Sequence, residues 1–269
     1  MSFRIGTVDI PDRIERSRYF RELSYLELSA LFAGPIKPGA LAKWKDFAPA
    51  GALGLVAPFV LTHRTAPKSA KPWDHDATTG DFRDSALGRA ALTQLHDGVK
   101  AVDAGFAIFH SPPVFGPSQA NRDRLAQFFG EVATEEAVGA KRVWVPAGQW
   151  ETRTAVKLAR EIGVICAFDP LVRAPDAPPE IYYDLDIDEL YLRITGLGRS
   201  GPIRSEKQED LIALLMEYAG LPVTIAFESP SRWADARNLK KLLEGVELDS
   251  SSSESPPDGD DDESGEDED

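Results

Sequence analysis

The chain has 269 residues, with 44 Asp and Glu against 30 Lys and Arg, and a formal net charge of −14 at pH 7. Its single cysteine excludes a disulfide scaffold and a cysteine-rich metal module. No apolar run approaches the roughly 18 residues that a membrane span needs, and residues 1–12 lack the layout of a signal peptide, so we expect a cytoplasmic protein that does not enter the membrane.

The negative charge is concentrated at the C-terminus. Residues 249–269 hold 11 of the 44 acids and no base, which leaves 33 acids against 30 bases in residues 1–248. This segment also contains no apolar residue, so it cannot bury enough surface to offset the entropy cost of ordering. The sequence therefore predicts one globular domain over residues 1–247 and a disordered acidic tail over residues 248–269.

Eight short runs of apolar and β-branched residues alternate with longer segments along the body. In chain order, we expect strands at residues 3–9, 25–29, 54–61, 104–110, 142–146, 164–169, 189–195 and 222–228. Pro58 lies inside the third run, where it removes a backbone donor.

Apolar residues at helical spacing follow most of these runs. The pattern predicts helices at residues 87–102, 118–132, 156–162, 205–218 and 231–243. Ser118 is a candidate N-cap, and Ser205 with Gln208 has the spacing of a capping box. Residues 170–188, rich in Pro and Asp, show no clear helix.

This alternation is typical of an α/β protein with a parallel sheet, and eight units in about 248 residues predict a single (β/α)8 barrel of the TIM type. The competing fold is a doubly wound open sheet. That fold normally carries a glycine-rich phosphate turn after an early strand, and none follows an early strand here.

Polar side chains stand where the expected strands end. In a barrel these positions converge on one face, so they predict a site for a small polar or anionic ligand. The candidate ligand-binding residues are Asp9, Glu27, His63, His110, Asp169, Arg193 and Glu228. The structural alternative is that the acids cap loops and that Arg193 forms an ion pair with Glu27 or Glu228.

Among these residues, Glu27 is the best candidate for a catalytic acid or base. In a hydrolase-like site, His63 and His110 would carry protons and Arg193 would hold an anion. We expect no metal or other cofactor, because neither H-E-x-x-H nor paired CxxC spacing occurs. Cys166 lies in an apolar run and is predicted to be a buried, unreactive thiol.

The segment Thr62–Asp84 is long for a connection between a strand and a helix. It combines several bases with Trp73, which could stack on a nucleic-acid base or contact an anionic ligand; the alternative is an irregular surface insertion. Nucleic-acid binding is the second hypothesis, although the near-neutral body disfavours it. A non-catalytic scaffold is the third. His75 and His96 are expected to face solvent.

The order of several motifs resembles that of the YecE-like family, also called domain of unknown function 72. The motifs run from residue 3 to residue 243 and include Phe3–Thr7, Leu26–Phe32, Ile108–Phe115, Tyr191–Gly196 and Ala226–Glu228. The resemblance implies a barrel. Its likeness to the endonuclease IV barrel suggests nucleic acid or a phosphorylated ligand, by analogy of fold alone.

The chain also departs from the pattern of that family. Residues 144–148 replace a Glu-Phe-Arg run, His110 replaces a Gln, Thr195 replaces a His, and Glu228–Ser229 replaces an Asn pair. Glu27, His63 and Arg193 remain. The chain is therefore identified as a divergent member, and these changes alter the charge pattern that a ligand shared with the family would meet.

Overall fold

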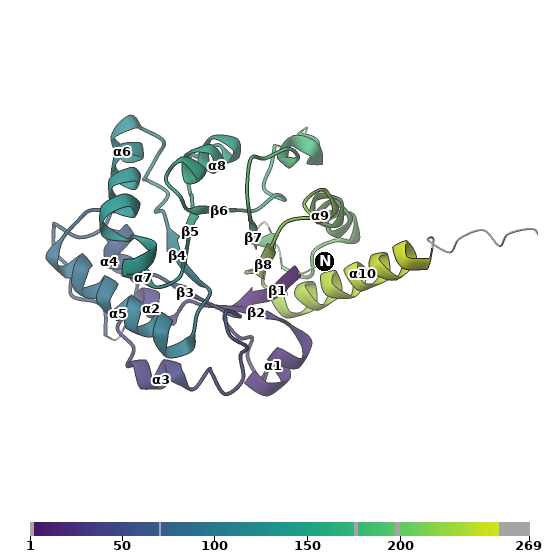
Figure 1. Cartoon of the computed structure of the whole chain (residues 1–269), viewed down its shortest axis with the longest axis horizontal. Helices are drawn as coiled ribbons and strands as arrows, with labels where there is room; N and C mark the ends of the chain where they lie inside the picture. Colours follow the sequence, from purple (N-terminus) through teal and green to yellow (C-terminus); the bar gives the residue numbers. More distant parts are fainter. Residues whose placement is uncertain (1–2, 70, 175–176, 197–199, 253–269) are drawn as a thin grey trace, which may run out of the picture.

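The computed structural model describes residues 3–69, 71–174, 177–196 and 200–252. Eight parallel strands form a closed barrel in sequence order, as predicted, and β8 returns to pair with β1 (Figure 1). The strands are β1 (Phe3–Val8), β2 (Tyr25–Leu28), β3 (Leu53–Val56), β4 (Phe106–His110), β5 (Lys141–Val145), β6 (Ile165–Phe168), β7 (Leu190–Ile194) and β8 (Val223–Phe227).

The helices surround the barrel and supply the connections between its strands (Figure 1). They are α1 (Arg16–Glu22), α2 (Ala30–Ala33), α3 (Pro38–Ala42), α4 (Phe59–Thr62), α5 (Ala86–Val102), α6 (Gln119–Gln127), α7 (Glu135–Val138), α8 (Thr152–Glu161), α9 (Ser205–Glu217) and α10 (Arg232–Ser252). A π-helix, η1 (Phe128–Val132), continues α6, and a 3-10 turn, η2 (Pro179–Tyr182), lies in the segment predicted to lack a clear helix.

Because side chains alternate between the two faces of each strand, the core has two parts. One set of side chains fills the barrel interior, with Tyr25, Phe106 and Tyr191 as its largest members. The other set packs between the strands and the helices. Gly54 makes room for Tyr25, because a Cβ at this position would lie 2.1 Å from the Tyr25 hydroxyl. The packed interior leaves the carboxyl ends of the strands, here called the mouth, as the place for a ligand site.

The third strand is shorter than predicted. β3 ends at Val56, and residues 59–62 form the helical turn α4 instead of extending the strand. Pro58 precedes this turn with φ −52° and ψ 137°, and because proline has no N–H it is better suited to start a helix than to continue a ladder. His63 therefore follows a helical turn and does not end a strand.

Two details of the helices also differ from the predictions. Ser205 is the first residue of α9 and does not cap it; the N-cap is Arg204, which makes no side-chain capping bond. Leu242, one of the apolar residues on whose helical spacing the predicted helix 231–243 rests, is 38% exposed. Ser118 does cap α6, since its hydroxyl accepts a hydrogen bond from the Asn121 N–H at 3.3 Å.

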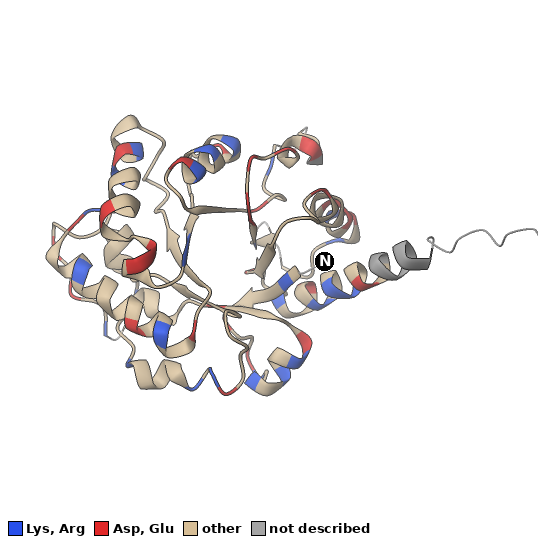
Figure 2. Ribbon diagram, in the orientation of Figure 1, with Lys and Arg blue, Asp and Glu red and all other residues tan. Residues whose placement is uncertain are grey.

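The predicted domain boundary at residue 247 falls within α10, which runs to Ser252. The rest of the predicted tail, residues 253–269, lies outside the described residues. Within the described part, Figure 2 shows Lys and Arg interspersed with Asp and Glu over the outer helices, in keeping with the near balance of charge in the body. None of the described helices is long and apolar enough to cross a membrane.

Candidate functional site

A buried carboxylate lies at the centre of the mouth. Glu27, on β2, has no exposed surface. One of its oxygens accepts a hydrogen bond from Arg193 Nε at 3.1 Å, and the other accepts one from the Tyr191 hydroxyl at 3.0 Å. The Tyr191 hydroxyl also lies 2.7 Å from that of Tyr25, so hydrogen bonds link β2 and β7 across the barrel interior. Arg193 forms a second ion pair with the half-exposed Glu228 at the rim.

These contacts set the charge of Glu27. Burial alone would raise the pKa of this carboxyl, but the Arg193 charge and the hydrogen bonds outweigh burial and lower the pKa to about 2. For Arg193, the lowering effect of burial is outweighed by the charges of Glu27 and Glu228, which raise its pKa. Glu27 is therefore ionised at neutral pH, so it can stabilise a neighbouring cation but has no proton to donate.

His110 ends β4 beside this carboxylate. Its Nε2 lies 3.8 Å from Glu27 Oε1, which is longer than a hydrogen bond, and it is buried without a partner among the described residues. The side chain is 19% exposed. Burial lowers the pKa of His110, although Glu27 opposes the shift, so the imidazole is neutral at pH 7. A neutral imidazole between a buried carboxylate and the mouth is suited to accept a proton.

His63 lies further toward the edge of the mouth. The Phe32 ring packs near both histidines, with ring centroids 5.1 Å from His63 and 6.5 Å from His110. Its Nδ1 is 2.7 Å from the Thr62 hydroxyl. Burial lowers the pKa of His63 to about 4; His110 adds to this shift and Asp81 opposes it. His63 is therefore also neutral at pH 7.

Asp9 and Asp169 are engaged in holding loops. Asp9 accepts hydrogen bonds from the Ser29 N–H at 2.8 Å and from the Ser29 hydroxyl. Asp169 accepts from the Leu171 N–H at 3.0 Å and from the N–H and hydroxyl of Thr195 at 2.8 and 2.7 Å. Five of the seven predicted residues therefore lie together at the mouth: Glu27, His63, His110, Arg193 and Glu228. The two aspartates instead form hydrogen bonds that hold loops.

Tyr25 and Tyr191 belong to the site but were not among the predicted residues. Each stands two positions before a predicted residue on the same strand, Tyr25 before Glu27 and Tyr191 before Arg193. Because side chains on a strand point to the same face at every second residue, this spacing was the feature of the sequence that could have identified them.

A glycine-rich spacing also lies in the connection between β7 and α9. Gly196, Gly198 and Gly201 form a G-x-G-x-x-G pattern between β7 and α9, and both Gly196 and Gly201 have positive φ. Residues 197–199 lie outside the described residues, so no ligand contact is assigned to this loop.

The long segment after α4 does not offer Trp73 for stacking. Trp73 is buried, and its Nε1 donates a hydrogen bond to the Leu31 carbonyl at 2.8 Å, so this side chain anchors the segment to α2. His75 is exposed, as predicted, whereas His96 is half-buried against Gly139. Cys166 is buried, and burial raises the pKa of its thiol.

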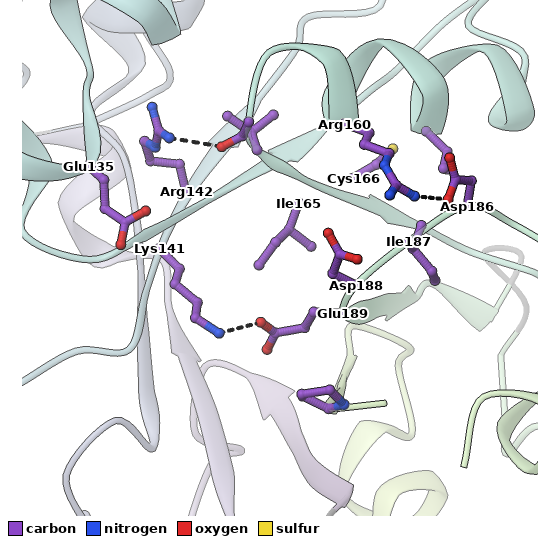
Figure 3. Close-up of a pocket in the computed structure, with 14 residues that line it drawn as sticks. Glu135, Lys141, Arg142, Arg160, Ile165, Cys166, Asp186, Ile187, Asp188 and Glu189 are labelled. Carbon is purple, nitrogen blue, oxygen red and sulfur yellow. Dashed lines mark hydrogen bonds and ion pairs between the residues drawn. The ribbon is translucent and has the colours of Figure 1, made fainter. Parts of the chain in front are cut away.

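A cavity of about 350 Å³ lies at the opposite end of the barrel, at the amino ends of β5 to β7 (Figure 3). Its charged groups are largely paired with one another: Lys141 contacts Glu189 at 2.5 Å, and Arg160 contacts Asp186. Arg142 donates hydrogen bonds to three backbone carbonyls. This end of a barrel contributes to stability, so the mouth remains the candidate site.

No group of three or more His, Cys, Asp or Glu side chains in the described ranges is arranged to hold a metal ion. The polar groups of the mouth are a buried carboxylate, two neutral imidazoles, a guanidinium and a carboxylate at the rim.

Fold and site together define a TIM-type barrel with a polar cluster at its mouth. No family model matches the sequence, and no curated protein matches it. Among solved structures, the chain is similar to a DUF72 family protein from Enterococcus faecalis V583, with 13% identity, a TM-score of 0.62, and coverage of 91% of this chain and 95% of that one. This likeness agrees with the predicted family resemblance at the level of the fold.

Two sugar epimerases also have this fold. One is 3-keto-D-glucoside 4-epimerase from E. coli, with 12% identity, a TM-score of 0.57, and coverage of 91% of this chain and all of the other (100%). The second is D-psicose 3-epimerase from Clostridium cellulolyticum H10, whose structure holds D-tagatose. It has 12% identity and a TM-score of 0.53, covering 94% of this chain and 99% of that one.

Proposed function

We propose that this chain is a divergent relative of the DUF72 proteins that binds a small, sugar-like ligand at the mouth and exchanges a proton with it. The observation that carries the proposal is the placement of His110, whose Nε2 is buried and faces the ionised Glu27 while part of the ring is exposed. The similarity to two sugar epimerases supports a hydroxylated ligand.

Each residue of the cluster has a distinct role in this proposal. Arg193 and the rim carboxylate Glu228 bind hydroxyl or carbonyl groups of the ligand, because both reach the mouth. His110 accepts a proton from the ligand at Nδ1, and the imidazolium that forms, whose Nε2–H faces Glu27, is stabilised by that carboxylate. Glu27 is a positioning residue, since it has no exposed surface and already holds Arg193 and Tyr191.

The test measures binding and proton exchange with neutral monosaccharides, starting with D-tagatose. Thermal shift reports binding, and NMR in D2O reports exchange of carbon-bound hydrogen for deuterium. We expect His110→Asn to lower the exchange rate by about 100-fold or more, the usual contribution of a positioned base, while ligand binding persists. Glu27→Gln should also slow exchange, because the imidazolium loses its partner.

Glu189→Gln is the matched control, because Glu189 is a buried, ion-paired glutamate at the opposite end of the barrel. Its exchange rate should equal that of the wild type. Exchange that is unchanged in both His110→Asn and Glu27→Gln would contradict the proton-transfer role. Failure of every monosaccharide to stabilise the fold would favour the scaffold hypothesis.

A further inference from the structure

A second cavity, of about 410 Å³, opens at the mouth beside His63. Its walls come from the segment after α4, from the loop after β4 and from α6. The polar residues that line it include Arg64, Asp81, Asn121 and Arg124. Two guanidinium groups thus share one cavity with a single carboxylate, next to the proposed proton-transfer residues.

The carboxylate is held by an uncommon backbone conformation. Gly80, Asp81 and Phe82 are consecutive residues with φ of +80°, +52° and +55°. Their N–H groups donate to the carbonyls of residues 60, 62 and 61 at 2.7, 3.0 and 3.0 Å, so the segment folds back on α4. L-residues rarely adopt this conformation, and the surrounding contacts must compensate its cost. Such strain is concentrated at functional sites.

This conformation places Asp81 between two guanidinium groups. The carboxylate, in a residue only 7% exposed, contacts Arg64 Nε and accepts a hydrogen bond from Arg83 Nη2 at 3.2 Å. One negative charge is therefore shared by two positive ones. Asp81 thus holds Arg64 at the cavity wall, but its single negative charge does not neutralise both Arg64 and Arg83.

Arg124 adds a third positive charge. It is half-buried on α6, and no hydrogen bond or ion pair engages its guanidinium among the described residues. Arg122, one half-turn earlier on the same helix, differs: it lies 5.4 Å from the centroid of the Trp150 ring and donates a hydrogen bond to the Pro117 carbonyl at 3.2 Å. Of the groups that line the cavity, Arg64 and Arg124 against Asp81 leave one positive charge without a counter-charge, and Arg83, outside the lining, shares the charge of Asp81 with Arg64.

We infer that this cavity binds a phosphate group, with Arg124 and Arg64 as its principal ligands, and that the molecule bound at the mouth is a phosphorylated sugar. The lining carries a net positive charge that favours an anion, and guanidinium groups bind oxyanions such as phosphate in a bidentate manner. The sugar part of this inference rests on the proposed function; the phosphate part rests on the cavity alone. His63 lines this cavity and packs against the Phe32 ring, which also lies near His110.

The first experiment titrates the full chain with inorganic phosphate at low ionic strength by calorimetry. Wild-type protein should bind phosphate, and Arg124→Gln should lower the affinity by about tenfold or more, because a charge-assisted contact is lost. Arg89→Gln is the matched control: Arg89 pairs with Asp84 on the exposed surface, outside the cavity, and the substitution changes the net charge equally. Its affinity should be unchanged.

Circular dichroism melting of each variant shows whether it is folded, and Arg124→Lys provides a second check, because it keeps the charge and should restore part of the affinity. Absence of phosphate binding by the wild type would overturn the inference. Binding that survives Arg124→Gln would also overturn it, and would place the anion elsewhere, for example at the glycine-rich loop after β7.

A second titration separates this inference from the proposed function. Glu27→Gln and His110→Asn lie outside the phosphate cavity and should bind inorganic phosphate as the wild type does. If they do so but no sugar undergoes exchange, the proposed function fails and the phosphate site stands. A sugar phosphate should bind more tightly than either inorganic phosphate or the neutral sugar; equal binding of the phosphorylated and neutral sugars would contradict the assignment of the ligand.

Discussion

Glu27 and Arg193 form a buried ion pair, and removing Arg193 should cost more stability than removing Glu27. Glu27 has no other cationic partner at hydrogen-bond distance among the described residues, whereas Arg193 also contacts Glu228. Arg193→Met would leave the Glu27 charge buried and uncompensated, and should lower the free energy of unfolding by about 3–5 kcal/mol. Glu27→Gln should cost less, since Arg193 keeps its partner at the rim. Urea denaturation of both variants measures the difference.

The double variant Glu27→Gln/Arg193→Met provides the control for this prediction. With both charges removed, it should be more stable than Arg193→Met alone, because no buried charge is left without a partner. If the two single effects simply add, the ion pair does not control the stability of the mouth.

The candidate site residues predicted from the sequence were those at the ends of strands. A strand-end rule places side chains at the mouth, and Glu27, His110 and Arg193 do lie close together there. The rule did not predict that Asp9 and Asp169 form hydrogen bonds with loop residues. Their partners, Ser29 and Thr195, come from neighbouring units of the barrel. Contacts across units depend on register, which the local pattern does not contain.

At the scale of elements, the segment Gly80–Phe82 is the most sensitive part of the phosphate cavity. A Cβ on Gly80 would lie 2.5 Å from the backbone of His63, and its φ of +80° disfavours any L side chain. Gly80→Ala should therefore destabilise the fold by about 1–2 kcal/mol from conformation alone, with the steric clash adding to this cost. It should also weaken phosphate binding, because Asp81 and Arg64 follow the same backbone.

Gly39→Ala is the matched control, since Gly39 lies in α3 with nothing within 4 Å of its Cβ position. That substitution should be neutral or slightly stabilising in thermal melts. Equal melting temperatures for Gly80→Ala and Gly39→Ala would show that the backbone at residue 80 relaxes without cost.

Most elements could be predicted because the barrel repeats one pattern eight times. The third strand was predicted to be too long. Residues 54–61 form one apolar run, and a short apolar run does not distinguish a buried strand from a buried helical turn. All four residues of α4 are buried, so no polar position revealed the helical period. The sequence left the role of Trp73 open between stacking and a surface insertion, because a loop residue gives no local sign of the helix it packs against.

At the scale of the whole molecule, the net charge of −14 does not describe the surface that a ligand meets. The body is close to neutral, and its mouth combines the paired charges of Glu27, Arg193 and Glu228 with the net positive lining of the phosphate cavity. Recognition of an anion by a chain of negative net charge therefore depends on the local arrangement of a few side chains, which composition cannot reveal.

The buried titratable groups of the mouth, His63, His110 and Glu27, make the stability of the fold depend on pH. The pKa of His63 is lowered to about 4 from its ordinary value of 6.5, so between these values the unfolded chain binds a proton that the folded chain does not. Stability should therefore fall as the pH drops from 6.5 to 4, and His110, whose pKa is also lowered, acts in the same direction. Glu27, with its pKa lowered to about 2, should add a further loss as the pH falls from 4.5 toward 2.

His63→Asn tests the first part of this dependence, since it removes one titrating group and retains a polar side chain. Urea denaturation at pH 7, 5.5 and 4 should show a shallower loss of unfolding free energy for His63→Asn than for the wild type, because one fewer proton is taken up on unfolding. His75→Asn, at an exposed histidine of the same segment, should follow the wild type. Parallel curves for the wild type and His63→Asn would mean that His63 titrates alike in the folded and unfolded chain, and that its burial at the mouth has no energetic consequence.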